Sequence, residues 1–174
     1  EKEISNKLQE ALDAGYAVLN NGGTSLDAIQ AAINVMENSP LFNAGKGAVF
    51  NSDGKNEMDA SIMDGKNLEA GAVSLITGIK NPISLARDVM EKSEHVFLAG
   101  EGAMRFAKAN DYQLESPEYF YDELRHQQWL DIKDTDGFQL DHTSTPLSNP
   151  TSAPLSNQKD SKFGTVGAVA CDKN

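Results

Sequence analysis

The stretch that decides how this chain folds is residues 163–171, which read Phe163-Gly164-Thr165-Val166-Gly167-Ala168-Val169-Ala170-Cys171. Small and β-branched apolar residues after a Gly-Thr step favour a buried strand. Residues 131–162, which precede it, are rich in Ser, Thr, Asn, Pro and Asp and repeat Pro-Leu-Ser-Asn. Such a stretch cannot bury enough apolar surface to fold by itself. The sequence therefore predicts a flexible linker over 131–162 that leads directly into a strand.

The Gly164–Thr165 step also has a chemical interpretation. A threonine hydroxyl becomes a useful nucleophile when a base lies beside it, and the nearest base is the α-amine of the same residue. That amine, with a reference pKa of about 7.7–8.0, exists only after the preceding peptide bond has been cut. Glycine at position 164 tolerates strained dihedral angles and leaves its carbonyl open to attack. Taken alone, however, the dipeptide is more typical of a simple strand start.

The region before the linker alternates between helical and strand patterns. Apolar residues at helical spacing predict a helical hairpin over residues 4–36, with Thr24-Ser25-Leu26-Asp27 as a capping box between the helices. Pro40 ends the second helix. Further patterns predict strands at 58–63, 70–77 and 95–99 and helices from Pro82, from Gly102 and from Pro117. Residues 1–130 are thus expected to form an α+β core.

Between the hairpin and the first predicted strand, residues 42–51 are rich in glycine and asparagine. Small residues let the backbone turn tightly, so that main-chain carbonyls could converge on a hard cation. Composition alone favours an ordinary helix-to-strand loop here, because glycine-rich loops are common.

Bulk composition narrows the classes of partner. The chain has 174 residues and a net charge of −11, which disfavours nucleic acid and anionic membrane surfaces. A single cysteine, Cys171, excludes an internal disulfide framework. The three histidines lack the spacing of metal ligands, and we assign no role to Asp59, which lies on a predicted strand face opposite to Asp64. One free cysteine and an acidic charge suit the cytoplasm, although the chain begins at Glu1 without a methionine.

The order of the motifs identifies a resemblance. After the helical hairpin come Pro-Leu-Phe-Asn-Ala-Gly-x-Gly-Ala-Val-Phe, Met-Asp-Ala-Ser-Ile-Met-Asp-Gly, Ala-Gly-Ala-Val, Asn-Pro-Ile-x-Leu-Ala-Arg, Gly-Glu-Gly-Ala, the linker, and Phe-Gly-Thr-Val-Gly-Ala-Val-Ala. This series resembles the plant-type asparaginase and isoaspartyl peptidase family over nearly the whole chain apart from the linker. It is similar, more distantly, to the glycosylasparaginases, which usually have Asp-Thr-Ile-Gly at the nucleophile.

The resemblance implies the four-layer αββα sandwich of the N-terminal-nucleophile hydrolases. The fold is expected to be incomplete here, because the family's first strand, with His-Gly-Gly-Ala-Gly, and most of its second subunit are missing. Residues 1–130 would form the α-subunit core, 131–162 the linker, and 163–174 the cleavage site with the first strand of the β-subunit region.

The resemblance also assigns site residues. Thr165 matches the family nucleophile, freed when its hydroxyl attacks the Gly164 carbonyl, and Asn43 matches a residue that orders the site. No cofactor is required, but some members bind a structural sodium ion through main-chain carbonyls. The matching residues in this chain are Met36, Glu37, Ser39, Phe42, Ala44 and Lys46. Since these ligands would be main-chain oxygens, the Lys46 side chain must point its ammonium away from the ion.

The implied activity is amide hydrolysis that releases L-aspartate from isoaspartyl dipeptides, L-asparagine or both, by a homodimer of precursors or a pair of cleaved heterodimers. In the family the substrate clamp and oxyanion hole follow the nucleophile, beyond this chain, so the chain by itself is expected to be inactive. Two alternatives stay open: a processing-dead relative that serves as a non-catalytic binding or assembly subunit, and a glycosylasparaginase-like amidase.

Overall fold

The computed structural model describes residues 2–133 and 165–173. Its helices are α1 (Lys2–Asn20), α2 (Ser25–Glu37), α3 (Pro82–Lys92), α4 (Gly100–Ala109), α5 (Pro117–Phe120) and α6 (Glu123–Ile132), with a short 3-10 turn, η1 (Gly45–Gly47). The strands are β1 (Met58–Met63), β2 (Ala70–Ile76) and β3 (Phe97–Ala99). This mixture of helices and strands confirms the predicted α+β class.

The three strands form one sheet in the order β1-β2-β3, in which β1 and β2 are antiparallel and β2 and β3 are parallel. The parallel pair requires a crossover connection, which α3 provides. Alternate residues of the strands, including Ile62 and Val73, are buried on the face that α3 covers. Residues of the opposite parity, such as Ser61 and Met63, lie on a face that is exposed within the described residues. The sheet therefore has one packed face and one open face.

Helix α3 supplies the centre of the core. Leu85, Ala86 and Val89 are all 0% exposed and belong to the stripe that their spacing predicts. Gly71 of β2 lies so close to this helix that a Cβ would come 2.6 Å from the Met90 backbone nitrogen. The absence of a side chain at Gly71 therefore lets the backbone of α3 pack directly against the backbone of β2.

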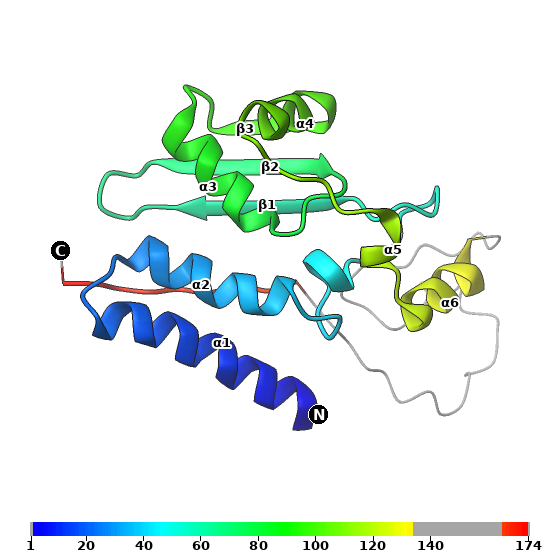
Figure 1. The fold of residues 1–174 in the computed structure, drawn as a ribbon, viewed down its shortest axis with the longest axis horizontal. Coiled ribbons are helices and arrows are strands. Elements are labelled where there is room, and N and C mark those ends of the chain that lie inside the picture. The colour runs from blue at the N-terminus through cyan, green and yellow to red at the C-terminus, as the bar shows by residue number, and fades with distance from the viewer. Residues whose placement is uncertain (1, 134–164, 174) are drawn as a thin grey trace, which may run out of the picture.

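The predicted helical hairpin is confirmed. Helices α1 and α2 pack against each other through small residues, and a Cβ on Gly15 would lie only 3.0 Å from the Ala28 carbonyl oxygen. The capping box is present, because the Thr24 hydroxyl accepts the Asp27 N–H and the Asp27 carboxylate accepts the Thr24 N–H. Figure 1 shows this hairpin beside the sheet, with the C-terminal segment running along α2.

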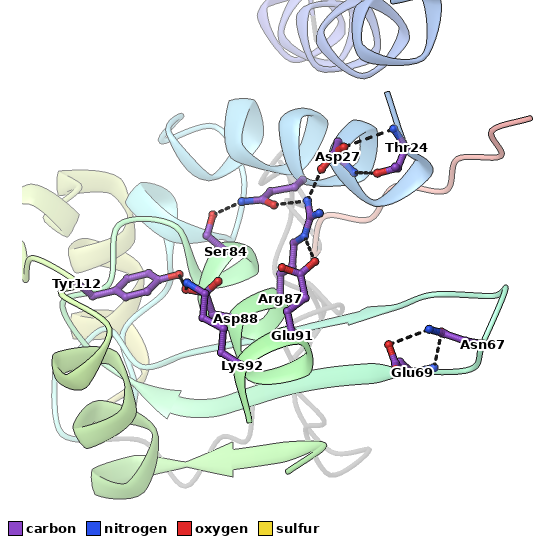
Figure 2. Close-up of polar contacts among 11 residues, drawn as sticks. Thr24, Asp27, Asn67, Glu69, Ser84, Arg87, Asp88, Glu91, Lys92 and Tyr112 are labelled. Carbon is purple, nitrogen blue, oxygen red and sulfur yellow. Dashed lines mark hydrogen bonds and ion pairs between the residues drawn. The ribbon is translucent and has the colours of Figure 1, made fainter. Parts of the chain in front are cut away.

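A polar network joins α2 to α3 (Figure 2). The Arg87 guanidinium lies 2.7 Å from the Asp27 carboxylate, 2.6 Å from that of Glu91 and 2.8 Å from the Gln30 amide oxygen. The hydrogen bond from the Thr24 hydroxyl and that from Arg87 both lower the pKa of Asp27. These contacts fix the start of α2 to the helix that anchors the core.

The last described segment differs from its prediction. Residues 165–173 pair with no strand in the described part of the chain, although alternate residues from Val166 to Asp172 are half-buried and the others are exposed. That alternation has the period of extended backbone. A strand needs a neighbour to supply the ladder of hydrogen bonds, and the described residues offer none at this position.

Two further predictions meet the limits of the described residues. Helix α6 continues to Ile132, just inside the range 131–162 predicted as linker, and the rest of that linker from residue 134 lies outside the described residues, as does Gly164. Among the described helices, none has both the length and the apolar character needed to cross a membrane.

Candidate active site

A cavity of about 650 Å³ lies between the sheet, α2, the start of α3 and residues 165–168. One wall is formed by β1 and β2, and a second by the face of α2 that carries Ile29 and Ile33. The loop that follows α2 and residues 165–168 complete it. Segments from the start, middle and end of the described chain therefore converge on one space.

Thr165 and Asn43, the candidate nucleophile and its predicted supporting residue, both line this cavity. Thr165 is exposed, whereas Asn43 is half-buried. The Asn43 Oδ1 atom accepts the Val49 N–H at 3.0 Å, which fixes the orientation of the side-chain amide. The fold thus brings together two residues that lie in widely separated parts of the sequence.

The loop that carries Asn43 is folded tightly on itself. The Ala44 N–H donates to the Phe42 carbonyl at 2.9 Å, and the Gly47 N–H donates to the Ala44 carbonyl at 3.1 Å. Gly45 has a φ of 52°, in the left-handed region that favours glycine. A Cβ there would lie 2.8 Å from Glu37 Cβ and closer still to the Glu37 carbonyl oxygen. The two ends of the loop therefore touch through their backbones.

These contacts bear on the predicted sodium ligands. The carbonyl oxygens of Glu37 and Phe42 each face a glycine of the loop, Gly45 and Gly47 respectively. The carbonyls of Met36, Phe42 and Ala44 each accept an N–H within the loop and keep a second lone pair. Among the described residues, no group of three or more His, Cys, Asp or Glu side chains could hold a metal ion. A cation here would accordingly rely on main-chain oxygens, and the loop fits that requirement.

The two remaining predicted ligands have side chains with other partners. Ser39 is 4% exposed, and its hydroxyl oxygen accepts the Leu41 N–H at 3.3 Å. The Lys46 ammonium lies 5.5 Å from the centre of the Tyr119 ring, which attracts it as a cation–π partner. Both residues thus leave their carbonyls, rather than their side chains, as the groups available to an ion.

Glu37 is a site residue whose side chain the sequence reasoning missed. It is 3% exposed, and its carboxylate accepts the Ile83 N–H at 2.9 Å and the Asn81 amide at 3.1 Å. Burial raises its pKa to about 7, against the opposing effect of these two hydrogen bonds. Because Ile83 lies in the first turn of α3, the carboxylate is also favoured by the helix dipole. The sequence signal that could have found it is its spacing of four residues from Ile33, which puts both side chains on one face of α2.

Replacing Glu37 with alanine is expected to destabilise the fold by about 2–4 kcal/mol, because the Ile83 N–H and the Asn81 amide would lose a buried acceptor. Urea unfolding of the variant measures this loss. The matched control is Glu57→Ala, since Glu57 lines the same cavity but is exposed. Equal destabilisation by the two substitutions would show that Glu37 has no special structural role.

Asp59, to which the sequence assigned no role, lies at the cavity wall. Its Oδ1 atom accepts the Ser74 hydroxyl at 2.6 Å and the Leu75 N–H at 2.9 Å, across a shift in the β1–β2 register. Leu75 has a φ of 54°, so this carboxylate holds a left-handed residue in place. Together with Glu37 and Glu57 it makes the described lining of the cavity acidic, with no Lys, Arg or His among those lining residues.

Comparison with known proteins agrees with the order of the motifs. A family model described as Asparaginase matches residues 1–174. The chain is 42% identical over 165 residues to an isoaspartyl peptidase of Escherichia coli (strain K12), covering 95% of this chain and 48% of the relative. It is 52% identical over 132 residues to a plant-type L-asparaginase of Pyrococcus abyssi, covering 76% of this chain and 42% of the relative. It is 40% identical over 171 residues to an isoaspartyl peptidase/L-asparaginase of Danio rerio, covering 98% of this chain and 50% of the relative. The chain spans about half the length of the curated relatives it matches. A match along the whole chain, together with the identity to these relatives, means that this chain belongs to the asparaginase family.

Proposed function

We propose that the full-length natural protein is a self-processing threonine amidohydrolase that releases L-aspartate from isoaspartyl dipeptides, L-asparagine or both. The observation that carries this proposal is the shared cavity of Thr165 and Asn43 in a chain of the asparaginase family. The relatives named isoaspartyl peptidase and L-asparaginase support the substrate class.

Processing comes first in the proposed sequence of events. The Thr165 hydroxyl oxygen attacks the Gly164 carbonyl carbon, and the peptide C–N bond breaks as an ester to the hydroxyl forms. The displaced nitrogen takes up the hydroxyl proton and becomes the free α-amine of Thr165. Water then hydrolyses the ester, which leaves a carboxylate on Gly164 and restores the hydroxyl.

Hydrolysis of the substrate uses the same hydroxyl of Thr165, and the α-amine freed by processing now acts as its base. The free α-amine accepts the hydroxyl proton as the oxygen attacks the side-chain amide of the substrate. Ammonia, or the second amino acid of the dipeptide through its α-amine, leaves with the proton that the Thr165 amine had accepted. Water then hydrolyses the aspartyl ester on Thr165. The exposed carboxylates of Glu57 and Asp59 on the cavity wall would favour the positively charged α-ammonium group of such substrates.

The test of this function is aspartate release. Purified full-length protein is incubated separately with a β-linked aspartyl dipeptide, its α-linked isomer and L-asparagine, and free L-aspartate is quantified. We expect release from the β-linked dipeptide, L-asparagine or both, and none from the α-linked control. If neither the β-linked dipeptide nor L-asparagine is hydrolysed, the proposed activity is refuted.

We also propose that the loop binds a structural sodium ion through the carbonyls of Met36, Glu37, Ser39, Phe42, Ala44 and Lys46. Binding to the folded state alone stabilises it by mass action, by about 1.4 kcal/mol at a sodium concentration ten times the Kd. Thermal unfolding in NaCl should therefore occur a few degrees higher than in choline chloride of equal ionic strength. Identical melting temperatures in the two salts would argue against the ion.

A further inference from the structure

The segment after the candidate nucleophile runs along α2 in the opposite direction to the helix. Its start, at Thr165, lines the cavity with Glu37, the last residue of α2. Its far end, at Asp172, meets Ser25, the first residue of α2. Figure 1 shows the extended segment beside the helix, and the side chains of Val166 and Ala168 pack against the core.

The contact at the far end is a hydrogen bond from the Ser25 N–H to the Asp172 carboxylate, 2.6 Å long. The first N–H groups of a helix have no partner within it and favour a negative charge. The capping box satisfies the Asp27 N–H through Thr24, and Asp172 satisfies that of Ser25. Because Arg87 holds Asp27 to α3, the end of α2 that receives Asp172 is itself fixed to the core (Figure 2).

The lengths of the two elements match. Seven residue steps of extended chain from Thr165 to Asp172 span about 23 Å at about 3.3 Å per residue. The twelve steps of α2 span about 18 Å at 1.5 Å per residue. A segment anchored at the start of α2 therefore reaches just past the end of that helix, where the loop with Asn43 begins.

The register of this segment decides where Thr165 lies. A slip of one residue along α2 would move Thr165 by about 3.3 Å and turn its side chain to the opposite face. The residues between the two ends are Val, Gly, Ala, Val, Ala and Cys, all of them small, so apolar packing distinguishes neighbouring registers weakly. A hydrogen bond to one particular N–H is lost when the segment slips, and it therefore distinguishes these registers strongly.

We propose that Asp172 is a positioning residue that sets the register of residues 165–173 along α2 and thereby holds Thr165 at the cavity that Asn43 also lines. That Asp172 positions a nucleophile rests on the proposed function, whereas its role in setting the register of residues 165–173 does not. Asp172 acts through Ser25 and the end of α2, at the opposite end of the helix from the reacting bond.

The first arm of the test measures processing in the full-length natural protein. Asp172→Ala is expected to slow cleavage of the Gly164–Thr165 bond about tenfold or more, because small misplacements of reacting groups are costly. Asp172→Asn keeps an acceptor of the same shape and should retain a rate within about threefold. The appearance of two fragments on denaturing gels gives these rates.

The matched control is Thr24→Ala, which removes a cap from the same end of α2 without touching the segment. It should lower the melting temperature by about 2–4 °C, as Asp172→Ala should, yet leave the cleavage rate within about twofold of the natural protein. Equal slowing by Thr24→Ala and Asp172→Ala would show that Asp172 only stabilises the helix, and would overturn the proposal.

The second arm, hydrogen exchange, separates this proposal from the proposed function. Amide exchange of Ser25 and of peptides from 165–173 should accelerate in Asp172→Ala and stay slow in Thr24→Ala, even if the natural protein never cleaves itself. Faster exchange confined to Asp172→Ala supports the register role, and unchanged exchange overturns it. Natural-rate cleavage in Asp172→Ala would also overturn it, while leaving the amidohydrolase function intact.

If Asp172→Ala fails to fold, Asp172→Asn is measured in both arms. Near-natural cleavage and exchange in Asp172→Asn support the proposal, and slowing as severe as that predicted for alanine overturns it.

Discussion

Alanine at position 165 is expected to abolish cleavage of the chain, so that Thr165→Ala in the full-length protein runs as one uncleaved band on a denaturing gel. Without the hydroxyl, neither the ester with Gly164 nor a later ester with substrate can form. Intact mass spectrometry should find no fragment beginning at residue 165. Aspartate release should fall to the background rate, because the free α-amine is never generated either.

Two further variants sharpen this prediction. Thr165→Ser retains a hydroxyl and should process, more slowly, because the lost methyl group no longer restricts the side-chain rotamer. Thr77→Ala removes an exposed threonine elsewhere and should process at the natural rate. Two fragments of the natural sizes from Thr165→Ala would mean that another residue performs the cleavage.

Alanine at position 47 is expected to destabilise the fold strongly, by about 3 kcal/mol or more. A Cβ on Gly47 would lie 2.8 Å from the Pro40 carbonyl oxygen and closer still to that of Phe42. Both neighbours are backbone atoms in a loop that closes on itself, so neither can move without opening the loop. Because Asn43 lies in that loop, processing should fall together with stability.

The control for this substitution is Gly102→Ala. Gly102 lies inside α4, and a Cβ there would meet nothing within 4 Å. Alanine is favoured over glycine in a helix by about 0.5–1 kcal/mol, so this variant should be as stable as the natural protein or more so. Urea midpoints for the two variants test the contrast, and a Gly47→Ala protein of natural stability would disprove the tight loop.

Several elements could be predicted from sequence because their causes are local. The stripe at Leu85 and Val89 marks a helix by its spacing, Pro82 marks its first turn, and the Thr24–Asp27 pair caps α2 as expected. Periodicity, caps and proline act within a few residues, so a short window of sequence contains the information.

Other features could not be predicted because their partners are distant in sequence. The Glu37 carboxylate accepts an N–H from Ile83, and that of Asp172 accepts one from Ser25. No local pattern tells which helix end an acidic residue will meet. Pairing of residues 165–173 with a neighbouring strand likewise depends on what lies beside them, which propensity does not encode.

The sequence by itself determined the kinds of element, their approximate limits and, through the order of the motifs, the family and the candidate nucleophile. Only the tertiary structure decided that one face of the sheet is open among the described residues and that Thr165 and Asn43 line one cavity. It also decided that acidic side chains of three separate segments hold backbone N–H groups around that cavity and along α2. The reason is physical: helix and strand formation depends on neighbours along the chain, whereas a site is made by side chains that packing brings together from distant positions.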